Sequence, residues 1–239
     1  MGTLYVVGTP IGNLEDISLR AQRILAEVAA VAAEDTRVTR KIYERYALSS
    51  PGIRFSCHEH NESQAVPRIL GLLAAGENVA LCSDGGMPGI SDPGYRVINA
   101  CHDAGHGVEI IPGPSAITTA LVASGLPGAS FTFKGFPPRK SGQRRRFLEE
   151  DKASAHTLVF FESPHRIAAL LRDALEILGD RRAAVCVEMT KQYEAVHRDY
   201  LSELTRAFAS GKTVRGEITV VVAGNNPKFT NPSASGNDT

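Results

Sequence analysis

Short apolar runs alternate with amphipathic segments along most of the chain. The first run, residues 3–8, ends in glycine, and leucine and isoleucine then recur at helical spacing between residues 19 and 28. Two further apolar runs, 77–82 and 107–113, lie on either side of another segment with helical spacing. Strands that alternate with helices in this way predict an α/β fold with mostly parallel sheets.

A break in this pattern divides the chain. Residues 125–130, GLPGAS, are rich in glycine and proline, and the alternation of strand and helix resumes after them. We therefore expect one α/β lobe over residues 1–124 and a second over 125–225. Residues 226–239 are polar and have the composition of a disordered tail.

The composition is that of an ordinary globular protein, with 43% hydrophobic and 22% charged residues in a chain of 239. Lys and Arg (26) balance Asp and Glu (26), so contact with a nucleic acid requires a local basic patch. The four cysteines form no CxxC pair, and no ligand set has the spacing of a metal site, so we expect buried free thiols and no metal. The N-terminus lacks the pattern of a signal peptide, and no apolar run reaches the ~20 residues of a membrane span, so we expect a cytoplasmic protein with no membrane contact.

Three loops rich in glycine and proline follow predicted strands of the first lobe: GTPIGN (8–13), SDGGMPGISDPG (83–94) and PGPSA (112–116). Open α/β sheets bind ligands at the carboxyl ends of their strands, where glycine lets the backbone approach the ligand closely. Three such loops in one lobe predict a shared small-molecule site. The sequence has neither the GxGxxG spacing of a dinucleotide loop nor a complete Walker A loop.

A basic stretch at residues 133–147, FKGFPPRKSGQRRRF, contains no acidic residue and three phenylalanines. In a chain of zero net charge, such a stretch favours a polyanion site over the alternative of a solvated helix face. Its cations are Lys134, Arg139, Lys140, Arg144, Arg145 and Arg146.

Four polar clusters also stand at the ends of predicted strands, where α/β enzymes form their active sites. They are AEDTR (33–37), SCHEHNE (56–62), FESPHR (161–166) and EMTKQYE (188–194). Taken singly, each cluster is more often a salt-bridged turn than a catalytic site.

The order and spacing of these motifs, together with GFPPRK, resemble the tetrapyrrole-methylase superfamily of S-adenosylmethionine enzymes over residues 2–224. Within it the chain is most similar to the branch that methylates a cytidine 2′-oxygen in 16S rRNA. GTPIG in the first loop departs from the GxGPG of the corepressor-synthesis branch, which weakens a tetrapyrrole substrate. The resemblance implies two α/β lobes with the donor in the cleft between them, and a homodimer.

The resemblance also implies which residues hold the donor, S-adenosylmethionine. In the first lobe they are the Gly-Pro loop, the loop after the fourth strand and a Ser-Ala pair, and in the second lobe they lie in three separate segments. Carried onto this chain, these residues are Pro10, Asp84, Gly86, Met87, Ser115, Ala116, Phe161, Met189 and Glu217.

Methylation of a ribose 2′-hydroxyl requires alignment of the oxygen with the methyl group and benefits from a proton acceptor and a nearby cation. The candidates are Glu34, Asp35, Arg37, Glu59, Glu62, Lys191 and Glu194. The sequence does not assign the base among them, and a purely structural role for most of them is equally open. The substrate is either free 16S rRNA or the small ribosomal subunit, and the basic stretch would hold RNA phosphates.

Two rival functions remain. A C-methyltransferase of the tetrapyrrole pathway shares the fold and the donor, but a macrocycle gains little from six extended cations. A non-catalytic RNA-binding assembly factor is disfavoured because the glycine-rich donor loops are retained.

Overall fold

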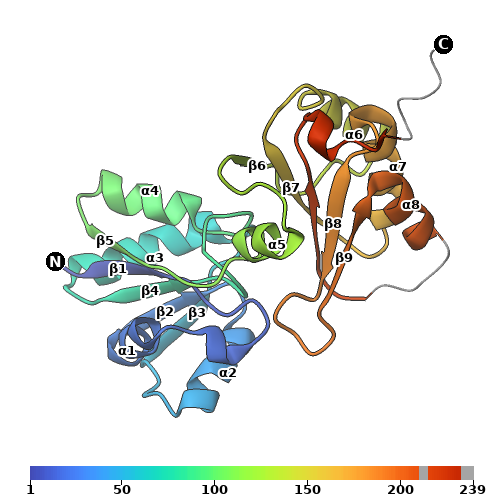
Figure 1. The fold of residues 1–239 in the computed structure, drawn as a ribbon. Helices are drawn as coiled ribbons and strands as arrows, with labels where there is room; N and C mark the ends of the chain where they lie inside the picture. The colour runs from blue at the N-terminus through green and yellow to red at the C-terminus, as the bar shows by residue number, and fades with distance from the viewer. Residues whose placement is uncertain (210–214, 233–239) are drawn as a thin grey trace. The chain divides into compact units, whose positions relative to one another are not determined.

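The computed structural model describes residues 1–209 and 215–232. The chain separates into two compact units, with the division between Ser115 and Ala116 (Figure 1). This division comes earlier than the boundary expected at residue 124. The reason is that helix α5 (Ala116–Ser124) packs on the second sheet, where Ile117 and Leu121 join its hydrophobic core.

The first unit contains a five-stranded sheet in the order β3-β2-β4-β1-β5, and all of its strand pairs are parallel. The alternation of strand and helix that the sequence predicts is confirmed here. Its elements are β1 (Thr3–Val7), α1 (Leu19–Glu27), β2 (Ala30–Ala33), α2 (Thr36–Tyr46), β3 (Ile53–Ser56), α3 (Glu62–Ala74), β4 (Val79–Cys82), α4 (Tyr95–Asp103) and β5 (Gly107–Ile111), with a 3₁₀ turn at Leu14–Asp16.

Helices cover both faces of this sheet (Figure 1). Helices α1 and α2 pack on one face through Ile24 and Ile42, and α3 and α4 pack on the other through Ile69 and Val97. A strand covered on both faces has no polar side, which explains why the residues of β2 and β4 are all buried. Polar residues of these strands therefore lie at the strand ends and in the loops that follow them.

The second unit contains a five-stranded sheet in the order β6-β7-β10-β8-β9. Helices α6, α7 and α8 pack against one face, and α5 packs against the other. The further elements are β6 (Phe131–Phe133), α6 (Ser141–Glu149), β7 (Thr157–Glu162), α7 (Ile167–Leu178), β8 (Arg182–Val187), β9 (Ala195–Tyr200), α8 (Leu201–Ala209) and β10 (Ile218–Val222), with a 3₁₀ turn at Pro227–Phe229.

The α/β class is confirmed for both units, but the second sheet is mixed instead of mostly parallel. Only β6 and β7 are parallel; β10 runs antiparallel to both of its neighbours, and β9 runs antiparallel to β8. A parallel pair needs a long crossover, and residues 188–194 join β8 to β9 without a helix. The two strands therefore pair as a hairpin.

Residues 226–232, which the sequence predicts to be disordered, form a 3₁₀ turn and contacts within the second unit. Asn226 accepts a hydrogen bond from the amide of Lys228 at the start of the 3₁₀ turn, and Thr230 forms a β-bridge with Arg181. The side chain of Asn231 donates to the Asp180 carboxylate (2.7 Å). Residues 233–239 of the expected tail lie outside the described residues.

The cysteines Cys57, Cys82, Cys101 and Cys186 are buried free thiols, as expected. Over residues 1–209 and 215–232, no helix is long and apolar enough to cross a membrane. In the same part of the chain, no group of three or more His, Cys, Asp or Glu side chains is placed to hold a metal ion.

Candidate functional site

The glycine-rich loops of the first unit lie against one another at the carboxyl ends of β1, β4 and β5. Strand β1 lies between the other two, so the loops that follow the three strands are neighbours. The amides of Thr9 and Gly86 each donate to the other residue's carbonyl (2.9 and 3.0 Å), and the Thr9 hydroxyl donates to the carbonyl of Ser83. The structure thus brings together the loops that the sequence singled out.

Two of these glycines resist replacement, Gly8 because its neighbours leave no space for a side chain and Gly86 because of its backbone conformation. A Cβ on Gly8 would come within 2.6 Å of the Gly113 amide nitrogen and of the Met87 sulfur. Gly86 has a φ of +91°, a conformation that side chains rarely adopt. Pro10 is buried beside them, while Ser115 is partly exposed at the end of the third loop. The backbone therefore forms a closely packed cradle at this edge.

A carboxylate cluster stands at the same edge, where β2 and β4 end side by side. The Asp84 amide donates to Oε2 of Glu34 (3.1 Å), and Oδ1 of Asp84 accepts from the Asp35 amide (2.9 Å). The two loops thereby hold each other through side-chain-to-backbone bonds. Three of the predicted residues, Glu34, Asp35 and Asp84, are brought together.

The carboxylates of this cluster differ in proton affinity. Partial burial raises the pKa of Glu34, although the hydrogen bond from Asp84 opposes the shift. Hydrogen bonds from Arg37 lower the pKa of Asp35 to about 2, and Asp35 also accepts the Arg37 amide at the start of α2. Burial also raises the pKa of Asp84, so Glu34 and Asp84 are both stronger bases than Asp35, which is occupied by Arg37.

Glu62 has a different environment from the one that a proton acceptor would need. Its side chain is buried, and Oε1 accepts the amides of Gly94 (2.9 Å), Arg96 (2.9 Å) and Val97 (3.4 Å) at the start of α4. These bonds satisfy amides that a helix leaves unpaired, which is the work of a capping residue. The α4 helix thus receives a capping carboxylate from α3.

Glu59 is exposed on the turn after β3. Its side chain forms no ion pair or hydrogen bond with the residues that the structure describes. Its neighbour His58 is partly buried, and its Nδ1 atom lacks a partner within the described part of the chain. The polar cluster 56–62 therefore divides into an exposed carboxylate and a buried cap.

In the second unit, the end of β8 carries a strained turn. Glu188 (φ +51°) and Thr190 (φ +66°) both adopt left-handed conformations, which are rare for a β-branched residue such as threonine. The exposed Glu194 accepts the amide of Thr190 through Oε2, which closes the turn. Met189, between the two strained residues, is buried in the core beneath α5. Such strain is commonly found at functional segments.

Lys191 is the cation of this turn. Its Nζ donates to Oε1 of Glu188 (2.9 Å) and to Oε2 of Glu217 (3.1 Å). Burial lowers the pKa of Lys191, but these two carboxylates outweigh that effect and raise it overall. Lys191 is therefore an ammonium ion at neutral pH and not a proton acceptor. Sequence reasoning missed Glu188 as an individual residue, and it organises the turn by also accepting the Glu217 amide.

Three cations of the basic stretch are neutralised by acids from outside it. Lys134 pairs with Glu150 and Asp151, Arg144 with Asp173, and Arg145 with Glu176. Arg144 is also buried. The stretch looked uncompensated because α6 continues into acidic residues and α7 brings further acids across to it. These ion pairs weaken the expectation that Lys134, Arg144 and Arg145 contact RNA directly, which stays a prediction.

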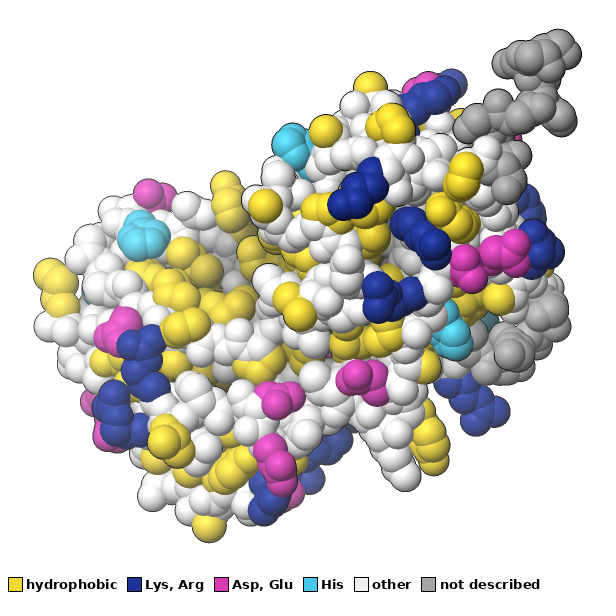
Figure 2. All heavy atoms as spheres, in the orientation of Figure 1, with side chains coloured by type: hydrophobic (Ala, Val, Ile, Leu, Met, Phe, Trp, Pro, Cys, Tyr) yellow, Lys and Arg dark blue, Asp and Glu magenta, His cyan; other side chains and the backbone are white. Residues whose placement is uncertain are grey.

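The other three cations, Arg139, Lys140 and Arg146, are exposed and form no ion pair with the described residues. Phe136 is 56% exposed and rests against the ring of Phe161, with 5.5 Å between the ring centroids. On the face shown in Figure 2, Lys and Arg side chains of the second unit stand apart from one another with apolar side chains between them. The exposed basic surface is thus smaller than the sequence suggests.

Comparison with known proteins agrees with these features. A family model described as Tetrapyrrole (Corrin/Porphyrin) Methylases matches residues 3–205. A relative from Thermotoga maritima, named ribosomal RNA small subunit methyltransferase I, is 47% identical over 94% of this chain and 99% of its own. Relatives of the same name are 47% identical in Halalkalibacterium halodurans (95% of this chain, 78% of its own) and 43% identical in Bacillus subtilis (95% and 76%).

Solved structures agree on the fold. A uroporphyrin-III C-methyltransferase from Thermus thermophilus has a TM-score of 0.65 at 23% identity, covering 93% of this chain and 94% of its own. Another structure described as that enzyme, solved with S-adenosylhomocysteine, has a TM-score of 0.63 at 21% identity, covering 93% and 97%. At these identities the likeness concerns the fold alone.

Proposed function

The chain belongs to the tetrapyrrole methylase family, and we propose that it transfers a methyl group from S-adenosylmethionine to a cytidine 2′-oxygen in the decoding region of 16S rRNA. The observation that carries the proposal is the identity of 43% and 47% with ribosomal RNA small subunit methyltransferases I over nearly the whole chain. The loops and carboxylates described above lie within the matched segment.

The first unit fits the donor in two respects. Its glycine-rich loops pack so closely that a Cβ at Gly8 would collide with them, which leaves backbone groups to meet a ligand. Asp84, an exposed carboxylate at the end of β4, suits hydroxyl or cationic groups of the donor. When bound, S-adenosylmethionine supplies an electrophilic methyl group on a sulfonium centre.

In this proposal Pro10, Gly86, Met87 and Ser115 form the donor cradle of the first unit together with Asp84. Donor contacts by Ala116, Phe161, Met189 and Glu217 remain predictions of the family resemblance. Ala116 begins α5, and Phe161 is partly buried against Phe133 and Phe136.

Glu34 is the proton acceptor in this proposal. Its pKa is raised by burial, so its carboxylate is a stronger base than that of Asp35, which Arg37 stabilises in the charged form. Oε2 is held by the Asp84 amide, which leaves Oε1 to accept the proton of the ribose hydroxyl. Asp35 then acts by holding Arg37, and Glu62 by capping α4.

The RNA surface consists of Arg139, Lys140 and Arg146, which act on phosphates, and Phe136, whose exposed ring can stack on a base. Lys191 is held by Glu188 and Glu217, so a direct action on a phosphate or on charge at the acceptor oxygen stays a prediction. The substrate is the 16S rRNA, free or within the small ribosomal subunit.

A direct comparison of acceptors tests the proposal. The protein is incubated with S-adenosylmethionine labelled in its methyl group and with small subunits or free 16S rRNA from a strain that lacks the modification, or with uroporphyrinogen. We expect label in an RNA acceptor alone. Label in the macrocycle would support the tetrapyrrole C-methyltransferase, and donor binding without transfer to any of these acceptors would contradict the proposed activity.

The proposal includes a homodimer in the cytoplasm, where ribosomes are assembled. The homodimer is implied by the family resemblance and is compatible with an edge strand, β5, on which Ile110 is 49% exposed. Light scattering at micromolar concentration checks it: a mass of one chain would contradict a stable dimer.

A further inference from the structure

The loop between β6 and α6, residues 135–140, leaves the sheet at Gly135, whose carbonyl still accepts the Phe161 amide of β7 (2.9 Å), and residues 137–139 are held by side chains. Gly135 turns the chain out of β6 with a φ of +61°. Pro137 and Pro138 follow and have no amide hydrogen, so this part of the loop cannot donate to a β-ladder. The carbonyl groups of residues 137–139 nevertheless find partners, which come from two arginines.

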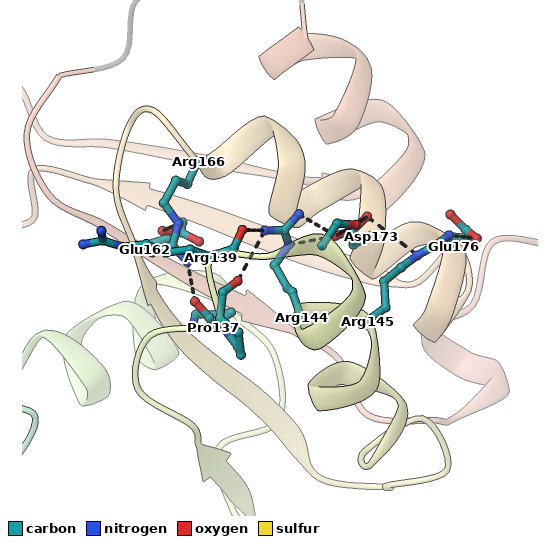
Figure 3. A network of polar contacts seen from close by, with 10 residues as sticks. Pro137, Arg139, Arg144, Arg145, Glu162, Arg166, Asp173 and Glu176 are labelled. Atoms are coloured by element: carbon teal, nitrogen blue, oxygen red, sulfur yellow. Dashed lines mark hydrogen bonds and ion pairs between the residues drawn. The ribbon is translucent and has the colours of Figure 1, made fainter.

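Arg166, just before α7, holds the first part of the loop. Its Nη2 donates to the carbonyl of Pro137, and its Nε lies 3.1 Å from Oε1 of Glu162 (Figure 3). The Glu162 side chain is completely buried, and its Oε1 also accepts the Ser163 amide (2.8 Å). The end of β7 thereby places a buried carboxylate beside the guanidinium and balances its charge.

Arg144, in α6, holds the second part of the loop. Its Nη1 donates to the carbonyls of Arg139 (3.0 Å) and Pro138 (3.4 Å), and its Nε donates to Oδ2 of Asp173 (2.8 Å). Arg144 is 4% and Asp173 6% exposed, so the pair is withdrawn from water (Figure 3). Buried ion pairs contribute little net stability compared with apolar residues, so we assign a geometric role to this one.

The outward side of the same loop carries the exposed Phe136, Arg139 and Lys140. Arg139 contributes to both sides of the loop: its carbonyl accepts a hydrogen bond from Arg144, while its own side chain is exposed to solvent. A loop that is already ordered loses less conformational entropy when it binds.

We propose that Arg144 and Arg166 are positioning residues for RNA: anchored by Asp173 and Glu162, their guanidinium groups clamp the carbonyls of residues 137–139 and so preset the loop that presents Phe136, Arg139 and Lys140. The inference rests on the proposed RNA substrate. It assigns to Arg144 of the basic stretch and to Arg166, which lies outside that stretch, a role that depends on the shape of the guanidinium group and not on its charge.

Replacement of arginine by lysine separates shape from charge, because lysine keeps the charge but lacks the planar fork. We expect Arg166→Lys to raise KM for small subunits roughly tenfold, with kcat and the Kd for S-adenosylmethionine within about twofold of wild type. Hydrogen exchange of the amides at 139–143 should quicken, while β7 and β10 stay protected. Arg172→Lys, an exposed arginine on α7, is the matched control and should change none of these quantities.

A second variant guards against the case in which Arg166→Lys fails to fold. Arg144→Lys removes the other clamp and should produce the same combination of raised KM and faster exchange in the loop. Unchanged KM and loop exchange in both variants would overturn the proposal. Loss of donor binding together with loss of protection in β7 would also overturn it, since both arginines would then serve the fold only.

The RNA surface itself is tested separately by the double variant Arg139→Glu, Lys140→Glu. A large rise in KM in this variant, with wild-type KM in the lysine variants, would refute the positioning role of Arg144 and Arg166 and leave the RNA surface in place. An unchanged KM in the double variant would refute the RNA surface on which the clamp depends.

Discussion

Glu62→Ala should destabilise the first unit without removing the chemistry. The buried Glu62 carboxylate accepts three amides at the start of α4, and two of those bonds are buried. Loss of a helix cap costs up to about 2 kcal/mol. An orphaned buried amide adds about 1 kcal/mol or more.

The sum for Glu62→Ala is therefore about 3 kcal/mol, which corresponds to a fall in Tm of roughly 6–12 °C for a chain of this size. Glu62→Gln keeps an acceptor oxygen but loses the charge, which roughly halves the strength of each bond, so its Tm should fall by less. Thermal unfolding followed by calorimetry with and without S-adenosylmethionine gives these values. Glu59→Gln, at the exposed neighbouring carboxylate, is the control and should leave Tm within about 1 °C.

Methylation should be measured at a temperature where the Glu62→Ala variant is fully folded and binds the donor. We expect kcat within a fewfold of wild type. A loss of roughly a hundredfold or more under those conditions would show that Glu62 takes part in the reaction, and the capping interpretation would then be refuted.

Four further predictions concern the reaction, the pH dependence of stability and the RNA surface. Glu34→Gln should lower kcat by roughly 10²–10⁴-fold with donor affinity retained, and a wild-type rate in the variant would exclude Glu34 as the base. Because burial raises the pKa of Glu34, the wild-type pH–rate profile should lose activity as pH falls through a value above the ordinary pKa of glutamate. Because its pKa is raised by folding, the protonated form of Glu34 contributes to the free energy of unfolding, and this contribution is lost as pH rises through the folded-state pKa. Chemical denaturation of wild type and Glu34→Gln across pH 4–8 measures the loss. Lys191→Met should lower methylation while leaving donor binding in place, whereas equal kcat/KM in variant and wild type would reduce Lys191 to a structural cation. Neutralising Arg139, Lys140 and Arg146 together should flatten the dependence of log K on log salt by roughly one unit for each phosphate that the variant no longer binds, and an unchanged slope would show a solvated surface.

Local sequence patterns were sufficient to predict where the strands lie and where the loops that follow them begin. Glycine and proline after apolar runs mark strand ends directly, and the three loops do meet at one edge because β1 lies between β4 and β5. The direction of strands in the second sheet could not be predicted in the same way. The buried residues Ile218–Val222 give one apolar run whichever way β10 is oriented.

Long-range partners are the main reason why the surroundings of the candidate site residues could not be predicted from the sequence. The acids that neutralise Arg144 and Arg145 lie about thirty residues further along the chain, so a window of sequence around 133–147 cannot reveal them. Glu62 was indistinguishable from Glu59 by position, and only the approach of α4 to α3 shows that one is a buried cap and the other an exposed carboxylate. The role of Glu188 likewise depends on its contact with Glu217.

The central claim is methylation of a ribose oxygen in the small-subunit rRNA, and mapping of the transferred methyl group tests it most directly. Small subunits that lack the modification are treated with the protein and S-adenosylmethionine, and the rRNA is digested and analysed by mass spectrometry. The account predicts one new methyl group on the 2′-oxygen of a cytidine in the decoding region, absent with Glu34→Gln. A methyl group on a base, or no methyl group from a protein that binds both donor and subunit, would contradict it.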